Sequence, residues 1–351
     1  MPGHDIIVIG ASAGGVEALT HLIAGLPQDI PAAIFVVLHI SPHGTSVLPS
    51  ILRRAGRLPV QHAADGDEIR MGHVYIAPPD LHLLIRGDKI RLSRGPTENA
   101  SRPAIDPLFR SAATSYGPRV IGAVLSGVLD DGTAGLIAIK RCGGIAVAQN
   151  PDEALFDGMP RSAIEHAFVD FIVPVAEMAA IFDRLAREPV ELHEGTTPMA
   201  GEMENEVRID DMDEAAMHTT VEEGPPSALT CPECQGALWE LHEGDLVRFR
   251  CRVGHAYSAE TLLAEQSDAL EAAMWQAFRA LKESAALARK LGDRSAARGS
   301  DRVTEQFRQQ EREAEERAAI IRQALLRGTT ALQQHMHDGV SAHLPDLAHR
   351  R

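Results

Sequence analysis

The sequence predicts an α/β fold over residues 1–187, with a doubly wound, mostly parallel sheet. Strand and helix patterns alternate along this segment, which is typical of a parallel sheet covered by helices. The first apolar strand runs directly into Gly-x-Ser-x-Gly at residues 10–14, and a helical pattern follows. Residues 60–95 instead show short strands separated by turn residues, which indicates an antiparallel excursion with a hairpin.

Apolar spacing places the individual elements of this domain. We expect strands near residues 5–10, 33–38, 73–77, 121–126, 144–149 and 170–173. We expect helices near residues 14–26, 44–55, 106–116, 132–141, 160–167 and 175–186.

Composition limits the class of protein. The chain has 351 residues, 44% of them hydrophobic, which is enough for one sizeable α/β domain with additions. No run of 18 apolar residues occurs, and the N-terminus enters a strand without a basic and apolar leader, so we expect a cytoplasmic protein without membrane insertion. The four cysteines are unevenly placed, which argues against a disulfide framework.

The net charge of −15 is concentrated in one segment. Residues 188–224 contain twelve acidic residues and a single basic one, Arg208. Such a density with few aromatic residues predicts a disordered linker over residues 188–228. The charge gives no support for nucleic-acid binding, so we expect no nucleic-acid partner.

Ser12 is the candidate nucleophile. A serine at a tight turn between strand and helix exposes its hydroxyl at the carboxyl edge of the sheet, and the helix start offers N–H groups for developing negative charge. A dinucleotide-binding turn and a purely structural glycine-rich turn are the alternatives. A dinucleotide-binding oxidoreductase is disfavoured, because the tip of the second strand carries His39 where that fold needs an acid.

His39 is the candidate general base, since the carboxyl ends of neighbouring parallel strands share one crevice. It follows a buried strand without a break, unlike the competing histidines His43, His62, His73, His82 and His166. The orienting carboxylate is expected after the strand near residues 121–126, where Asp130 and Asp131 precede a helix. Either acid could also cap that helix, since capping and orienting the base are not exclusive, and a metal site at the pair is a weaker alternative.

Six motifs in this order resemble the catalytic domain of the chemotaxis protein-glutamate methylesterases (CheB-like), over about residues 4–186. They are Gly10–Gly15, Leu38–His39, Tyr75–Pro78, Arg102–Asp106, Ser126–Gly132 and Phe156–Arg161. The resemblance implies a doubly wound parallel sheet. It also implies hydrolysis of glutamate methyl esters on the cytoplasmic helices of receptors, and deamidation of glutamine at such sites, with no cofactor for catalysis.

The resemblance assigns roles to three residues. Ser12 matches the family's nucleophile, His39 its base and Asp131 its orienting acid. Val128 stands where these enzymes usually have Met, whose backbone N–H helps form the oxyanion hole, and Ala13 replaces a frequent Thr. Both departures are compatible with the family's chemistry, but they leave undetermined which receptor is the substrate.

Two further differences from the family bear on regulation and on Asp130. Asp130 falls where the family often has Asn. The chemotaxis enzymes usually carry an N-terminal receiver domain, whereas this chain begins at the catalytic strand itself. We therefore expect no control by a fused receiver.

A second constellation follows the acidic segment, with the spacing Cys231-x2-Cys234-x16-Cys251-x3-His255. Three thiols and one imidazole at this spacing are typical of a structural zinc site. The residues between the two pairs predict a hairpin, and a module of about thirty residues needs a metal to be stable. We therefore expect a zinc-ribbon-like module over residues 229–257; three reduced thiols in a loop are the alternative.

The remaining residues predict helices. Apolar residues at helical spacing over 258–291, ended by Gly292, and a second charged helix over about 301–327 indicate a helical hairpin or self-association element within residues 258–330. Residues 331–351 are expected to be disordered.

These features leave two hypotheses from different classes. The first is a serine hydrolase acting on methylated receptor helices or related signalling proteins. The second is a slow or non-catalytic signalling scaffold that uses the ribbon and helical tail to bind partners. Intact Ser12, His39 and Asp131 favour the hydrolase.

Overall fold

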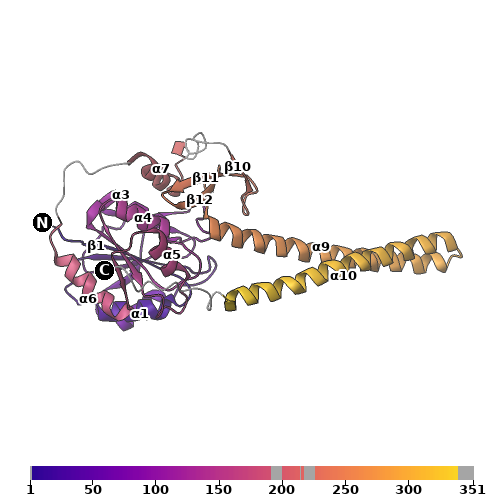
Figure 1. Ribbon diagram of the computed structural model, residues 1–351, viewed down its shortest axis with the longest axis horizontal. Helices are drawn as coiled ribbons and strands as arrows, with labels where there is room; N and C mark the ends of the chain where they lie inside the picture. The colour runs from indigo at the N-terminus through magenta and orange to yellow at the C-terminus, as the bar shows by residue number, and fades with distance from the viewer. Residues whose placement is uncertain (1, 191–199, 214, 217–225, 339–351) are drawn as a thin grey trace, which may run out of the picture. The chain divides into compact units, whose positions relative to one another are not determined.

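The structure is a computed structural model that describes residues 2–190, 200–213, 215–216 and 226–338 (Figure 1). The chain divides into two compact units, Met1–Ala264 and Glu265–Arg351. Each unit is described by itself.

A seven-stranded, fully parallel sheet forms the centre of the first unit, in the order β3-β4-β2-β1-β7-β8-β9. All six residues of β1 are buried, as expected for the middle of a parallel sheet. The strand order reverses beside β1. In such sheets ligands bind in the crevice at the carboxyl ends of the strands on either side of the reversal, here β1, β2 and β7. The strands are β1 Ile6–Ala11, β2 Ala33–Leu38, β3 Val60–His62, β4 Val74–Ile76, β7 Val120–Val124, β8 Ile145–Gln149 and β9 Phe171–Val173.

Helices cover both faces of the sheet, which confirms the predicted doubly wound fold. Ile7 and Ile9 of β1 belong to one hydrophobic cluster, and Ile6 and Val8 to the other, as the alternation of side chains along a strand requires. Figure 1 shows α1 and α6 on one side of the sheet and α3 and α4 on the other. The helices are α1 Gly15–Gly25, α2 Leu48–Ala55, α3 Ile105–Tyr116, α4 Thr133–Arg141, α5 Gly158–His166 and α6 Val175–Arg187, with a short 3-10 turn at Gly117–Arg119.

The excursion is smaller than predicted. Only β5 His82–Arg86 and β6 Lys89–Ser93 form an antiparallel hairpin. The strand β4, predicted as part of the excursion, pairs in parallel with β2 inside the main sheet. The edge strand β3 was not predicted, because its three residues bury only Val60 and therefore carry almost no apolar pattern.

A four-stranded antiparallel sheet follows in the same unit, built from β10 Pro226–Thr230, β11 Ala237–Glu243, β12 Leu246–Cys251 and β13 Ala256–Ser258. The predicted hairpin between the two ligand pairs is confirmed as β11–β12. We call residues 226–258 the ribbon. Its core is small and contains Cys231, Leu238, Phe249, Cys251 and Tyr257 together with Leu262.

The prediction of disorder over 188–228 is wrong for Ala200–Asp210, which form helix α7, and for residues 226–228, which begin β10. Residues 191–199, 214 and 217–225 of that segment lie outside the described residues. The physical reason is that acidic side chains of α7 are not solvated: Glu206 and Asp210 pair with buried arginines, so their charges hold the segment to the domain.

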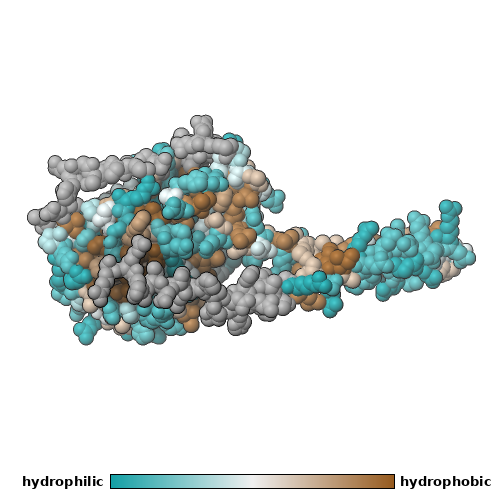
Figure 2. Space-filling view, in the orientation of Figure 1, coloured by the Kyte–Doolittle hydropathy of each residue, from teal (hydrophilic) through white to brown (hydrophobic). Residues whose placement is uncertain are grey.

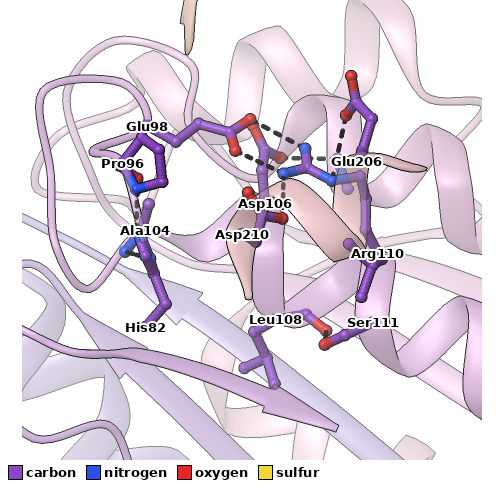
Figure 3. A network of polar contacts seen from close by, with 12 residues as sticks. His82, Pro96, Glu98, Ala104, Asp106, Leu108, Arg110, Ser111, Glu206 and Asp210 are labelled. Atoms are coloured by element: carbon purple, nitrogen blue, oxygen red, sulfur yellow. Dashed lines mark hydrogen bonds and ion pairs between the residues drawn. The ribbon is translucent and has the colours of Figure 1, made fainter. Parts of the chain in front are cut away.

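These pairs belong to a buried ionic network that joins α3, α7 and the ribbon (Figure 3). Arg110 of α3 donates to Glu98 at 2.9 Å and to Asp210 at 2.9 Å. Arg248 of β12 donates to Glu206 at 3.1 Å and also binds Glu98. Burial alone would raise the pKa of Glu98, but the charges of Arg110 and Arg248 lower it below its ordinary value.

The second unit contains most of a hairpin of two long helices, α9 Ala259–Ala296 and α10 Asp301–Asp338. Lys282 pairs with Glu315 at 2.8 Å and Arg289 with Glu311 at 2.6 Å, so the helices run antiparallel. Small buried side chains, including Ala285 and Ala318, allow close packing. Figure 2 shows mostly hydrophilic side chains toward the turn of the hairpin.

The predicted helical hairpin is thus present, with two corrections. The first helix passes through Gly292 to Ala296, and residues 331–338, predicted as disordered, are helical. Residues 339–351 lie outside the described residues. Self-association through the hairpin stays a prediction. No helix in the described part of the chain is both long and apolar enough to cross a membrane.

Replacing Arg110 by Ala is expected to destabilise the first unit by about 3–5 kcal/mol, because it leaves buried carboxylates without their cation. Chemical denaturation at pH 7 measures this change. Arg94→Ala is the matched control, since the Arg94 side chain is 74% exposed and its pair with Asp80 should contribute less than about 1 kcal/mol. Equal effects of the two substitutions would contradict a buried, interdependent network.

Candidate active site

Ser12 follows β1 directly and begins the turn into α1. Its N–H donates to the carbonyl of Ser126 at 2.9 Å, which ties the turn to the loop after β7. Gly14 has a φ of 74°, and a Cβ at this position would lie 2.6 Å from the Ser126 hydroxyl oxygen. The turn therefore requires glycine and presents the Ser12 hydroxyl at the crevice.

The parallel register of β1 and β2 places His39 beside Ser12. Ala11 pairs with Leu38, so the residues that follow these two strands are neighbours. The His39 Nδ1 atom lies 3.2 Å from the Ser12 Oγ atom, and its Nε2 atom lies 2.7 Å from Asp131 Oδ2. The nitrogen facing the carboxylate carries the proton, so the nitrogen facing Ser12 can accept one.

Asp131 follows β7 and points its carboxylate at the imidazole of His39, while its side chain is only 3% exposed. Burial alone would raise the pKa of Asp131, but the hydrogen bond and charge of His39, aided by other donors, lower it below its usual value. The carboxylate is thus ionised at neutral pH. Its other donors are the N–H groups of Ile105 at 2.7 Å, Asp106 at 3.3 Å and Gly132 at 3.0 Å, and the Asn99 amide at 3.0 Å.

Two residues near Asp131 were not assigned a role from the sequence. Asn99 donates its side-chain amide to both Asp131 and Asp106, at 3.0 and 3.1 Å. Burial, and next the charge of Asp131, raise the pKa of Asp106 well above its ordinary value. For Asp106, the sequence signal was its place at the end of the motif Arg102–Asp106. For Asn99 the sequence held no signal of a role in the site; the residue type only tolerates a positive φ, which is 49° here.

The structure separates the two acids that the sequence left as alternatives before the resemblance. Asp131 faces His39, whereas Asp130 accepts from the hydroxyls of Ser258 at 2.7 Å and Thr261 at 3.0 Å. Burial raises the pKa of Asp130 to about 6, although these two hydrogen bonds lower it. Asp130 therefore faces the end of the ribbon and the residues directly after it, not the base.

Backbone donors lie next to Ser12. The N–H groups of Ala13 and Val128 donate to no acceptor among the residues that the structure describes. Gly127 allows the two loops to approach closely, because a Cβ there would lie 2.9 Å from the Ser12 Cβ and 2.0 Å from the Met159 sulfur. These N–H groups are candidates for an oxyanion hole.

Among the competing histidines, His82 has a structural place. It is fully buried, its Nε2 donates to the Pro96 carbonyl at 2.9 Å, and its Nδ1 accepts from the Ala104 N–H at 3.3 Å (Figure 3). Burial lowers its pKa, which keeps the ring neutral. His82 thus holds the loop that carries Asn99.

The predicted metal ligands also converge. One ligand atom from each of Cys231, Cys234, Cys251 and His255 lies within 4.8 Å of the others. The His255 Nδ1 atom is 3.7 Å from the Cys231 sulfur and 3.5 Å from the Cys251 sulfur. The other cysteine, Cys142, ends α4 outside this cluster.

Replacing Asp130 by Asn is expected to stabilise the protein by up to about 3 kcal/mol at pH 8, because ionising this buried acid opposes folding. Its folded pKa of about 6 exceeds the ordinary 3.8, so the native state binds more protons between these values, and the unfavourable contribution grows as pH rises from about 4 to 6. Denaturation of both chains from pH 4 to 8 should show the gain vanish at pH 4. The exposed Asp152→Asn should show no such dependence; a pH-independent gain for Asp130→Asn would contradict the argument.

Comparison with known proteins agrees with this geometry. The family model "CheB methylesterase" matches residues 7–182. A protein-glutamate methylesterase/protein-glutamine glutaminase of Anaeromyxobacter dehalogenans is 42% identical over 183 residues, covering 52% of this chain and 54% of the relative. A putative one of Leptospira interrogans is 40% identical over 189 residues, covering 54% of this chain and 98% of the relative.

The crystal structure of the Thermotoga maritima CheB methylesterase catalytic domain is similar as well, with a TM-score of 0.50 and 36% identity over 52% of this chain and 98% of that one. The chain spans about half the length of several curated relatives, including those of Anaeromyxobacter dehalogenans and Methanosarcina mazei. The matches cover the α/β sheet with its helices, and α7, the ribbon and the α9–α10 hairpin follow them. The chain belongs to the CheB methylesterase family.

Proposed function

We propose that the protein is a cytoplasmic protein-glutamate methylesterase that hydrolyses glutamate methyl esters on the cytoplasmic helices of receptors or on related signalling proteins. The observation that carries this proposal is the hydrogen-bonded triad Ser12–His39–Asp131 at the crevice of the sheet. The names of the relatives support both the ester substrate and a second activity, deamidation of glutamine.

In the proposed first step, the Ser12 oxygen attacks the ester carbonyl carbon while His39 Nδ1 accepts the hydroxyl proton. Asp131 holds the imidazole in the tautomer whose Nδ1 is free to accept, and it stabilises the imidazolium that forms. The carbonyl oxygen becomes an oxyanion, to which the N–H groups of Ala13 and Val128 donate. Each such donor is typically worth about 3–4 kcal/mol in the transition state.

The tetrahedral intermediate then collapses. The bond to the methoxy oxygen breaks, His39 returns its proton to that oxygen, and methanol leaves an acyl-Ser12. Water, deprotonated by His39, attacks the acyl carbon and releases the glutamate carboxylate and Ser12. With a glutamine side chain the leaving group is ammonia, and the later steps are identical. These steps use only side chains, backbone N–H groups and water.

Ser12→Ala is expected to lower methanol release from methylated receptor cytoplasmic fragments by at least about 1000-fold, since it removes the nucleophile. The measurement is methanol released per chain with time. Ser41→Ala is the control, because Ser41 is exposed in the loop after β2 and does not belong to the triad Ser12–His39–Asp131.

The outcomes separate the two functional hypotheses. Loss of release in Ser12→Ala alone supports the esterase. If the native chain releases no methanol from several methylated receptors, the esterase proposal fails. The scaffold, with contacts made by the ribbon and hairpin, is then favoured.

A further inference from the structure

The four ligand atoms of the ribbon fit the dimensions of a zinc tetrahedron. Bonds of about 2.3 Å to sulfur and about 2.0 Å to nitrogen place two sulfurs about 3.8 Å apart, and a sulfur and a nitrogen about 3.5 Å apart. The Cys234 and Cys251 sulfurs are separated by 3.6 Å, and the His255 Nδ1 lies 3.7 and 3.5 Å from the Cys231 and Cys251 sulfurs. The donor set of three thiols and one imidazole is that of a closed structural site.

A carboxylate supports the imidazole of this set. The second ring nitrogen of His255 lies 3.3 Å from the Glu233 carboxylate, an arrangement that commonly orients histidine ligands of zinc. Glu233 also accepts from the hydroxyl of Thr97, in the loop that leads to Asn99. The outer shell of the ligand cluster therefore reaches the catalytic domain.

The backbone next to His255 pairs with the same loop. The Asn99 N–H donates to the Ala256 carbonyl at 2.9 Å, and the Ala256 N–H donates to the Thr97 carbonyl at 3.2 Å. Gly254 packs closely here, since a Cβ on it would lie 2.6 Å from the Pro96 side chain. The segment next to His255 is thus hydrogen-bonded to the loop that carries Asn99.

Two residues further on, Ser258 reaches the neighbourhood of the base. Its N–H donates to the Asn99 side-chain oxygen at 2.9 Å, and the same Asn99 amide donates to Asp131 at 3.0 Å. The Ser258 hydroxyl donates to Asp130 at 2.7 Å, and Thr261 adds a second hydroxyl. A continuous row of hydrogen bonds thus runs from the residues beside His255 to the carboxylate that orients His39.

We propose that Cys231, Cys234, Cys251 and His255 bind one Zn²⁺, and that the metal-folded ribbon positions Asp131 through Ser258 and Asn99. Ser258 and Asn99 are positioning residues, because they act on the substrate only through Asp131 and His39. The positioning role rests on the proposed esterase activity, whereas the metal site does not.

The core that the ribbon buries is too small for the ribbon to fold without a cross-link. Without a folded ribbon, the Asn99 oxygen loses its N–H donor and Asp130 loses its hydroxyl donors. Asn99 would then be free to rotate, and Asp131 would lose one of the donors that aim it at His39. Misplacement of a catalytic group by about 1 Å typically lowers rate about 100-fold.

The metal site is tested first, on the purified full chain. Elemental analysis is expected to find one zinc per chain, and Cys234→Ser is expected to lower this content and the thermal midpoint of unfolding. Cys142→Ser is the matched control, since Cys142 lies outside the cluster, and it should retain one zinc. A native chain that binds no zinc after refolding with excess Zn²⁺ would overturn the metal site.

The positioning role is tested on zinc-loaded chains, with kcat and KM for methanol release measured separately. Ser258→Ala with Thr261→Ala keeps the Ser258 N–H but removes the two hydroxyls that hold this segment to Asp130, whereas Asn99→Ala removes the amide between Ser258 and Asp131. Both are expected to lower kcat about 10- to 100-fold with KM and zinc content unchanged. Ser258→Thr with Thr261→Ser keeps both hydroxyls and should retain the native kcat. Ser227→Ala removes a hydroxyl that bonds within the ribbon, to the Leu238 carbonyl, and should leave kcat unchanged.

Each outcome has one meaning. An unchanged kcat in both the double variant and Asn99→Ala would overturn the positioning role. If Ser258→Thr with Thr261→Ser lowers kcat as much as the double alanine variant does, or if the lower kcat accompanies loss of zinc, the effect is merely structural and the positioning role is also overturned. If the native chain binds zinc but releases no methanol, the proposed function fails, the positioning role fails with it, and the metal site stands.

Discussion

The buried carboxylate of Asp131 is the constraint around which the catalytic crevice is organised. An ionised group at such low exposure is tolerated only when donors replace the water that it lost. Those donors come from elements far apart in the sequence: His39 after β2, the first N–H groups of α3, and Asn99 from the loop before α3. Hydrogen bonds to this one charge therefore bring His39, the start of α3 and the loop that carries Asn99 together. Ser12 completes the site because β1 is the neighbour of both β2 and β7.

The same requirement explains how the segments beyond the family's match attach to the domain. Arg110 and Arg248 are almost completely buried, and their charges are balanced by Glu98 and by acids of α7. The acidic segment after residue 187 thus supplies counter-ions to the domain. Removing any one member leaves its partners uncompensated, which makes the attachment cooperative.

Local signals were enough for the elements that build the crevice. Ser12 and His39 could be found because each directly follows a continuous apolar strand, and strand ends in a parallel sheet converge. The spacing of the three cysteines and His255 was also informative, because two ligands that are close in the sequence can share a metal with little help from the rest of the fold. Helix α7, the edge strand β3 and the environment of Asn99 were not predictable in this way. Their side chains are ordinary for exposed segments, and their partners lie elsewhere in the chain.

The sequence by itself determined the fold class, the motifs of the family and which residue types could serve as nucleophile, base and metal ligands. These depend on periodicity and on short-range geometry, which the order of residues encodes directly. Residue patterns left the choice between Asp130 and Asp131 open, and the resemblance to the family assigned Asp131. Only the tertiary structure decided that Asp130, adjacent to Asp131 in the chain, faces Ser258 while Asp131 faces His39. It also decided that acids of α7 are buried partners of arginine. Such choices depend on long-range pairing of buried charges, and a buried charge is stable only where folding supplies its partner.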